Sequence, residues 1–263
     1  IGGSGMCPIA EILFHRGYTI TGSDMNEGDT LDRVRSYGIE VHMGHRAENV
    51  EGADLVVYTA AVKSDNPELQ AAREKGIPCV ERSVMLGMLV DRYPDSIAIS
   101  GTHGKTTTSG MITTLFLKAG RDPSCVIGGK LPLIGSNGRA GKSDAMVCEA
   151  CEYVDTFLHL HPAVSVILNI DNDHLDYFGT LENIIRSFHQ FACQTSRLLV
   201  INGDDANTHK AVEGLHHVPV ITYGFGEENR FSAREVQDIP GAREQFVIYK
   251  DGQPFCPVSL SVP

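Results

Sequence analysis

The sequence SIAISGTHGKTTTS, at residues 96–109, decides the fold of the chain around it. It opens with a short apolar run at residues 97–99, which predicts a strand, and then reads GTHGKTT at residues 101–107. Apolar residues follow at positions 111, 112, 115 and 116, which is the spacing of one helix face. A strand, a loop with glycines, a Lys-Thr pair and a helix are the context in which a phosphate-binding loop occurs.

The residue types in this loop fit phosphate binding. Glycines let backbone N–H groups converge on phosphate oxygens, and the helix N-terminus adds a positive dipole end. Lys105 can neutralise the phosphates and the Thr106 hydroxyl can bind Mg²⁺. The usual spacing is G-x-x-x-x-G-K-[ST], whereas Gly101 precedes Gly104 by three positions, so an ordinary strand–turn–helix corner is the alternative. The predicted nucleotide-binding residues are Gly101, Thr102, His103, Gly104, Lys105, Thr106 and Thr107.

Composition places the chain among soluble globular proteins. Its 263 residues are 42% hydrophobic and 21% charged, and they allow one large domain or two smaller ones. No apolar run approaches the roughly 20 residues that span a membrane, and no segment is typical of a signal peptide. The net charge of −11 is spread over both halves and argues against nucleic acid as a partner. Seven cysteines without framework spacing predict reduced thiols in a cytoplasmic protein.

The first residues predict a second ligand-binding loop. IGGSGM at residues 1–6 precedes a helix-patterned segment and a strand-like segment at residues 18–24 that ends in Asp24. A glycine turn, a helix and a strand ending in an acidic residue form the first unit of a dinucleotide-type fold. Asp24 lies about 20 positions beyond the glycines, where a ribose hydroxyl would bind, and on this pattern alone NAD is an equally good ligand. No strand precedes the glycines, so we expect a fragment of a longer protein.

Strand and helix patterns alternate along the chain and predict an α/β fold with parallel sheets. The apolar pattern breaks at residues 91–95, which predicts a domain boundary between residues 1–94 and residues 95–263. The predicted helices lie at residues 31–37, 66–76 and 83–89. The predicted strands lie at residues 39–41, 54–59 (fully buried), 78–80, 145–148, 164–170, 198–201 and 218–223. Residues 245–249 and 254–262 flank Asp251-Gly252, which predicts an antiparallel hairpin.

Two acidic clusters follow predicted strands of the second domain. They read EACE at residues 149–152 and NIDNDHLD at residues 169–176. In a parallel sheet both would lie at the carboxyl edge, as the phosphate loop does. Mg²⁺ takes a few protein oxygens together with phosphates and waters, so Glu149 is the first candidate ligand, and general chemistry favours Asp173 over His174 as the second. The alternative is that these acids cap helices and complement their dipoles.

Other pairs of potential metal ligands carry weaker signals. The C-x-x-C at residues 148–151 has no second pair, and its first cysteine is expected to close a strand, so we interpret it as structural. The histidine pairs at positions 42 and 45, 159 and 161, and 216 and 217 are interpreted as solvated or capping side chains.

Several motifs together resemble the Mur ligase family. They are GGSGM at residues 2–6, GSD at residues 22–24, GTHGKTTT at residues 101–108, FLHLHP at residues 157–162 and N-x-x-x-DH-x-D at residues 169–176. They occur in the family's order and cover almost the whole chain. The chain departs from the family at CEY, residues 151–153, where many relatives have an Asp-Glu-Ser run.

The resemblance implies a Rossmann-like domain that binds a UDP-sugar, followed by a P-loop NTPase-type central domain that binds MgATP. The central domain would be incomplete and the C-terminal domain absent. The implied UDP-sugar contacts are Gly3, Ser4, Gly5, Met6 and Asp24. The implied catalytic residues are Lys105, Glu149 and His174. The implied metal ligands are Thr106, Glu149 and His174, which replaces Asp173.

The resemblance also implies an activity, the ATP-dependent ligation of L-alanine to the lactyl carboxylate of UDP-N-acetylmuramate in the cytoplasm, during peptidoglycan precursor synthesis. FLHLHP favours this activity over a sister ligase that attaches a recycled peptide. A non-catalytic nucleotide-binding relative is disfavoured because Lys105, Thr106, Glu149 and His174 are all present. An NAD-dependent oxidoreductase would leave the phosphate loop and both acidic clusters unexplained. The family continues with an adenine-contacting Gly-x-His-Asn segment and a C-terminal domain, so we expect no turnover from this chain alone.

Overall fold

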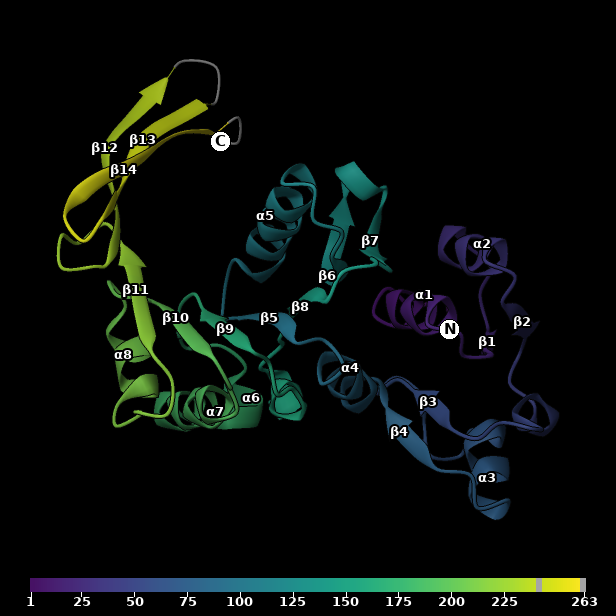
Figure 1. Ribbon diagram of the computed structural model, residues 1–263. Helices are drawn as coiled ribbons and strands as arrows, with labels where there is room; N and C mark the ends of the chain where they lie inside the picture. Colours follow the sequence, from purple (N-terminus) through teal and green to yellow (C-terminus); the bar gives the residue numbers. More distant parts are fainter. Residues whose placement is uncertain (240–242, 261–263) are drawn as a thin grey trace. The chain divides into compact units, whose positions relative to one another are not determined.

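The computed structural model describes residues 1–239 and 243–260 (Figure 1). The chain forms two compact units, each described here by itself. Unit 1 comprises Ile1–Ala98, Lys105–Ala150 and His159–Pro162. Unit 2 comprises Ile99–Gly104, Cys151–Leu158 and the chain from Ala163 onward.

Unit 1 alternates helices and strands along its first hundred residues. Its helices are α1 (Cys7–His15), α2 (Asp29–Ser36), α3 (Pro67–Glu74), α4 (Arg82–Val90) and α5 (Lys105–Lys118). Its strands are β1 (Thr21–Asp24), β2 (Glu40–Met43), β3 (Val56–Tyr58), β4 (Cys79–Glu81), β5 (Asp95–Ser100, whose last two residues belong to unit 2), β6 (Ser124–Leu131), β7 (Ser136–Arg139) and β8 (Ala145–Glu149). The expected helices and parallel strands of this region are confirmed, with ends shifted by a few residues.

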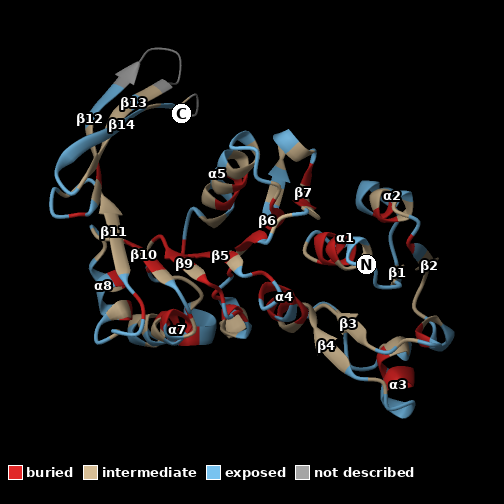
Figure 2. Ribbon diagram, viewed as in Figure 1, coloured by how far each residue is buried: buried red, intermediate tan, exposed pale blue. Residues whose placement is uncertain are grey.

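The N-terminal part of unit 1 contains two small parallel sheets. β1 pairs with β2, and β3 pairs with β4. The prediction that residues 54–59 form a fully buried strand is wrong. β3 covers only Val56–Tyr58 and all three residues are half-buried, because a two-stranded sheet gives the strand a single hydrogen-bonded neighbour. A core of four buried residues lies beside the first sheet and is formed by Cys7 and Ala10 of α1, Val34 of α2 and Ile39. Figure 2 shows that α1 and α4 are largely buried helices.

The remaining strands of unit 1 follow the order β5-β8-β6-β7. β6 is parallel to β8 and antiparallel to β7, and α5 packs against β6 and β8. A partly buried ion pair connects the N-terminal helices to this sheet. Arg33 of α2 binds Glu11 of α1 at 2.5 Å and donates to the Gly138 carbonyl of β7 at 2.7 Å.

Unit 2 is a mixed sheet flanked by helices. Its elements are the 3₁₀ segment η3 (Tyr153–His159), β9 (Val164–Ile167), α6 (Leu175–Phe178), α7 (Leu181–Cys193), β10 (Leu198–Asn202), α8 (Ala206–Val212), β11 (Val220–Gly224), β12 (Phe231–Ile239), β13 (Arg243–Lys250) and β14 (Gln253–Leu260). The strand order is β14-β13-β12-β11-β10-β9-β5. β9, β10 and β11 are parallel, whereas β13 and β14 form the expected antiparallel hairpin. The last two residues predicted for this hairpin, 261 and 262, lie outside the described residues.

Three phenylalanines form the centre of unit 2. The Phe157 ring stacks on Phe191 at 4.8 Å between centroids and meets Phe188 edge-on at 5.1 Å. All three side chains are almost fully buried. Phe188 and Phe191 lie on the apolar face of α7, so this contact fixes η3 against that helix. Within the part of the chain that the structure describes, no helix is long and apolar enough to cross a membrane.

Candidate functional site

Glu149 is the centre of a group of hydrogen-bonded residues in unit 1, called here the polar node, which also contains Thr106, Ser109 and Gly128. It is the last residue of β8, and its carboxylate accepts hydrogen bonds from the Gly128 N–H at 2.6 Å and the Ser109 hydroxyl at 3.1 Å. The Thr106 hydroxyl of α5 donates to the other carboxylate oxygen at 3.2 Å. The structure therefore brings together two of the predicted metal ligands, Thr106 and Glu149. Lys105 is the first residue of the same helix.

This node suits a hard divalent cation. A threonine hydroxyl and a carboxylate are oxygen ligands of the kind that Mg²⁺ prefers, and Mg²⁺ usually keeps only one or two protein ligands beside phosphates and waters. Among the residues that the structure describes, no group of three or more His, Cys, Asp or Glu side chains could hold a metal ion.

The first half of the predicted phosphate loop, at residues 101–104, belongs to unit 2 and is fastened to Asn169. The Thr102 N–H donates to the Asn169 carbonyl at 3.0 Å, and the His103 N–H donates to Asn169 Oδ1 at 2.8 Å. Asn169 Nδ2 returns a bond to the His103 carbonyl at 3.1 Å. The N–H groups of Thr102 and His103 thus serve to shape the loop, while the His103 side chain is exposed.

Gly101 has a backbone that only glycine tolerates here. Its φ is +140°, and an added Cβ would lie 3.0 Å from Leu168 Cβ and 3.1 Å from the Asn169 nitrogen. The glycine therefore allows the loop to cross closely over the end of β9. Gly104, at φ +87°, supplies the second turn of the loop before α5 begins.

The second acidic cluster is held by residues at the N-terminus of α8, a helix that was not predicted from the sequence. Asp205 caps α8 through the N–H groups of Asn207 and Thr208, and its Oδ2 accepts from the Ile170 N–H at 3.0 Å. Asn207 Nδ2 donates to the Ile170 carbonyl at 2.9 Å. The Asp171 N–H donates to the Thr102 hydroxyl at 2.9 Å, so this cluster and the phosphate loop share one hydrogen-bonded framework.

His174 lies at the N-terminus of α6 in a left-handed conformation, with φ of 52°. Its Nδ1 lies 3.8 Å from Asp173 Oδ1, and that carboxylate also accepts the His174 N–H at 2.8 Å. The side chain is about one-third exposed. Asp173 therefore acts on the backbone and ring of His174, and the choice between these two residues as the metal ligand stays a prediction.

The N-terminal loop turns tightly into α1. The Gly3 carbonyl accepts from the N–H groups of Met6 and Cys7, both at 2.9 Å, and Met6 is buried. Gly3 and Ser4 are exposed, and the Ser4 carbonyl accepts from Asn137. An added Cβ at Gly5 would lie 3.1 Å from the guanidinium of Arg82, so a cation lies against this loop. Arg82 was not among the predicted site residues, because its contact with Gly5 joins positions far apart in the sequence.

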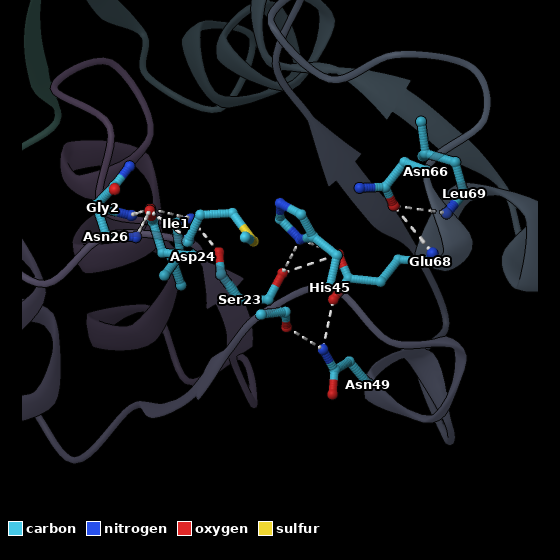
Figure 3. A network of polar contacts seen from close by, with 12 residues as sticks. Ile1, Gly2, Ser23, Asp24, Asn26, His45, Asn49, Asn66, Glu68 and Leu69 are labelled. Atoms are coloured by element: carbon cyan, nitrogen blue, oxygen red, sulfur yellow. Dashed lines mark hydrogen bonds and ion pairs between the residues drawn. The ribbon is translucent and has the colours of Figure 1, made fainter.

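Asp24 closes the loop from the end of β1 (Figure 3). Its Oδ2 accepts from the Gly2 N–H at 2.8 Å, and its Oδ1 accepts from Met25 and Asn26. Burial raises the pKa of Asp24, whereas the hydrogen bonds from the N–H groups of Asn26 and Gly2 are among the effects that lower it, and on balance this pKa lies below its usual value. Asp24 therefore shapes the turn around the glycines, and its predicted contact with a ribose stays a prediction.

A second polar cluster lies beside Asp24 (Figure 3). Glu68 accepts from the Ser23 hydroxyl at 2.8 Å and from Asn49 Nδ2 at 2.6 Å, and His45 Nδ1 lies 3.1 Å from both Glu68 and Ser23. Asn66 caps α3 just before Glu68. The interpretation of His45 as a solvated or capping side chain is wrong, because Ser23 and Glu68 converge on its ring across elements that are distant in sequence.

The cysteines of the C-x-x-C behave as the structural interpretation expects. Cys148 lies inside β8 with no exposed surface, and burial, together with the nearby Glu149 charge, raises its pKa to about 12. Cys151 is exposed, and both thiols are free. A thiol with so high a pKa is a poor nucleophile and a poor metal ligand at neutral pH.

Comparison with known proteins gives matches along both parts of the chain. Residues 1–94 match the profile described as "Mur ligase family, catalytic domain", and residues 99–260 match the profile described as "Mur ligase middle domain". The chain is 42% identical over 265 residues to the UDP-N-acetylmuramate–L-alanine ligase of Caldanaerobacter subterraneus subsp. tengcongensis. It is 43% identical over 270 residues to the ligase of that name from Acetivibrio thermocellus. These alignments cover all of this chain but only 57% and 56% of the two relatives.

Solved structures show the same fold. The UDP-N-acetylmuramate–alanine ligase of Thermotoga maritima superposes with a TM-score of 0.84 at 27% identity, covering all of this chain and 59% of that one. The UDP-N-acetylmuramate:L-alanyl-gamma-D-glutamyl-meso-diaminopimelate ligase of Neisseria meningitides superposes with a TM-score of 0.87 at 25% identity, covering all of this chain and 86% of that one.

Proposed function

We propose that this chain, which belongs to the Mur ligase family, is the UDP-sugar- and ATP-binding part of a ligase that joins L-alanine to UDP-N-acetylmuramate. The observation that carries the proposal is the 42–43% identity to two such ligases along the whole chain. The chain spans slightly more than half the length of these relatives, so the activity belongs to a protein that includes it. We assign residues 1–94 to UDP-sugar binding and residues 95–263 to ATP binding, in a cytoplasmic enzyme.

The polar node of unit 1 supports the ATP assignment. Lys105 and Thr106 begin a 14-residue helix, whose N-terminus favours phosphate through its dipole and its N–H groups. We assign charge stabilisation on the transferring phosphate to Lys105. Thr106 and Glu149, which already share a hydrogen bond, would hold Mg²⁺. His174, the third metal ligand that the family resemblance implies, is retained as a prediction. Bound there, Mg²⁺ would offset the negative charge that accumulates on the phosphate oxygens.

The N-terminal loop supports the UDP-sugar assignment. Gly3 and Ser4 are exposed before α1, and Gly5 is half-buried next to the Arg82 guanidinium. A helix N-terminus and an arginine together suit a diphosphate, since guanidinium groups bind phosphate oxygens through paired N–H donors. Met6 fixes the turn through its N–H, and Asp24 holds Gly2, so the loop would be formed before the ligand binds.

The proposed chemistry has two steps. The lactyl carboxylate attacks the γ-phosphorus of ATP, the bond to the β-phosphate oxygen breaks, and an acyl phosphate and ADP form. The L-alanine amine then attacks the acyl carbon, loses a proton and expels inorganic phosphate, which is a far better leaving group than the hydroxide it replaces. The chain's own task in the first step is positioning and charge stabilisation by Lys105 and the loop N–H groups, not covalent catalysis.

The test uses the complete gene product with MgATP and UDP-N-acetylmuramate. ADP release is followed while L-alanine, glycine, L-serine and the tripeptide L-alanyl-γ-D-glutamyl-meso-diaminopimelate are offered separately. Strongest release with L-alanine supports the proposal. Release with the tripeptide alone would instead make the protein a peptide-recycling ligase, the second candidate, which the fold match to the Neisseria enzyme favours. Nucleotide binding without any ADP release would point to a non-catalytic relative.

A further inference from the structure

The segment that follows β8 folds back over α6 through Tyr153. The Tyr153 ring lies on the His174 imidazole, with centroids 4.6 Å apart and planes inclined by 42°. Its hydroxyl donates to Asp176 Oδ2 at 3.4 Å, and the ring meets Tyr177 edge-on at 6.2 Å. One side chain thus contacts three residues of the short α6 segment, all within unit 2.

Asp155 makes a second attachment from the same segment. Its Oδ2 accepts from the Tyr177 hydroxyl at 2.7 Å, and its Oδ1 accepts from the Ser187 hydroxyl of α7. α6 contains only four residues, so it has little stability of its own. Tyr153 and Asp155 therefore help to fix α6, together with the packing of Phe178 and the hydrogen bond from Asn183 to its carbonyl.

Backbone strain marks the same place. Val154 and Asp155 have φ of 54° and 55°, and His174 has φ of 52°. The left-handed region costs an L-residue roughly 1–2 kcal/mol and is most unusual for a β-branched residue such as valine. Val154 is about half exposed, so packing of its own side chain does not compensate. The two strained residues instead let Tyr153 and Asp155 both reach α6, as expected when surrounding contacts hold a costly conformation at a functional site.

His174 itself has few other restraints. Its Nδ1 lies 3.8 Å from Asp173, and its Nε2 has no hydrogen-bond partner among the residues that the structure describes. The Tyr153 ring, with its centroid 4.6 Å from that of the imidazole, therefore restrains the plane of the imidazole.

We propose that Tyr153 and Asp155 are positioning residues that fix the orientation of the His174 imidazole, which the proposed function assigns as a metal ligand. This inference rests on the proposed function. Residues that orient a metal ligand typically change metal affinity by 10- to 100-fold when they are replaced. Tyr153 acts by ring contact, and Asp155 acts by fixing α6, which carries His174.

The first test is spectroscopic and needs no nucleotide. In the complete gene product, the His174 ring protons are assigned by their loss in a His174→Gln variant. Their chemical shifts should move in Tyr153→Leu, which removes the aromatic ring current, and should stay close to the wild-type values in Tyr153→Phe. Tyr18→Leu, at an exposed tyrosine far away in sequence, is the matched control and should leave them unchanged. Equal shifts in wild type and Tyr153→Leu would overturn the proposed contact.

The second test measures binding of Mn²⁺ with ATP by electron paramagnetic resonance. Tyr153→Leu should weaken Mn²⁺ binding by at least about tenfold, whereas Tyr153→Phe, which keeps the ring, should stay near wild type. Asp155→Asn should also weaken Mn²⁺ binding, because an amide offers only one acceptor oxygen to the two hydroxyl donors. This second variant keeps the inference testable if Tyr153→Leu has a much lower melting temperature than the wild type. Wild-type affinity in both Tyr153→Leu and Asp155→Asn would overturn the inference. No Mn²⁺–ATP binding by the wild type would instead overturn the proposed function.

Discussion

Adding one methyl group at Gly128 should disable the node around Glu149 without unfolding the chain. Gly128 is exposed and its φ lies outside the left-handed region, so its backbone accepts alanine. The new Cβ, however, would lie 2.7 Å from Glu149 Oε2, 3.1 Å from Glu149 Oε1 and 3.0 Å from Thr106 Oγ1. The Gly128 N–H already lies 2.6 Å from Glu149, so the carboxylate has no closer position to adopt and must turn away.

The size of the effect follows from what the carboxylate would lose. Hydrogen bonds to charged groups are worth about 1.5–3 kcal/mol each, and Glu149 accepts three. Loss of one such bond, partly recovered by rotation, should cost the folded chain about 1 kcal/mol. Gly→Ala at a compatible backbone position gains about 0.4–1 kcal/mol through the unfolded state, so the two effects nearly cancel and stability should change little. The displaced carboxylate would no longer lie beside Thr106 to hold a cation, and we expect about tenfold weaker binding of MgATP, or about 1.4 kcal/mol.

Titration with a fluorescent ATP analogue, with and without Mg²⁺, measures the affinity, and a thermal melt measures the stability. Gly28→Ala is the matched control, because its added Cβ would meet no atom within 4 Å and Gly28 lies before α2, away from the node in sequence. The expected signature is a loss of Mg²⁺-dependent affinity in Gly128→Ala alone, at an unchanged melting temperature. Wild-type affinity in Gly128→Ala would refute the assignment of Glu149, since the collision with its carboxylate does not depend on any ligand.

Three further outcomes are expected. Lys105→Ala in the complete gene product should lower ADP release by about 10²–10³-fold at saturating substrates, because one preorganised charge contact is lost; unchanged turnover would contradict the role of Lys105. Asn169→Ala removes two hydrogen bonds to His103 and should lower the free energy of unfolding, measured in urea, by about 2 kcal/mol. An unchanged free energy of unfolding would mean that other contacts hold the loop. Asp24→Asn should lower the melting temperature at pH 7. Because the folded-state pKa of Asp24 is lowered, the stabilisation by its carboxylate is complete above the ordinary pKa of about 3.9 and is lost as pH falls through the folded-state pKa. The difference in melting temperature between Asp24→Asn and the wild type should therefore disappear in acid. A difference that stays constant with pH would contradict this prediction.

Local sequence patterns predicted the elements whose stability is local. The helix after the phosphate loop, the strand before it and the strand at β8 all carry uninterrupted apolar spacing, and all three are present. β6 was not predicted because Gly128-Gly129 interrupts its apolar run. α7 was also not singled out, although Ile184, Phe188 and Phe191 follow helical spacing and gave a usable signal.

The candidate site was predictable as a set of residues but not as an arrangement. Lys105, Thr106 and Glu149 were predicted from their places after strands and in the loop. The structure brings Thr106 and Glu149 into contact, and the roles of all three residues stay predictions. The supporting residues were not predictable. Gly128 and Asn169 act through contacts with residues 21 and 66 positions away, and nothing in their own neighbourhoods indicates those contacts.

The positions where single-residue rules fail are concentrated around α6. By propensity, valine at position 154 should avoid the left-handed region, yet it adopts it. Asp155 and His174, whose residue types enter this region more readily, adopt it as well. Sequences are expected to be locally consistent except where function imposes a conflict. In this segment the strained backbone allows Tyr153 to contact the His174 imidazole and Asp155 to accept from the hydroxyls of Tyr177 and Ser187. These contacts help to fix α6, whose four residues are too few to form a stable helix alone. Val154→Gly, which relieves the strain without touching either contact, should therefore leave the His174 ring shifts unchanged. Large movement of those shifts would mean that the valine, rather than Tyr153 and Asp155, holds His174 in place.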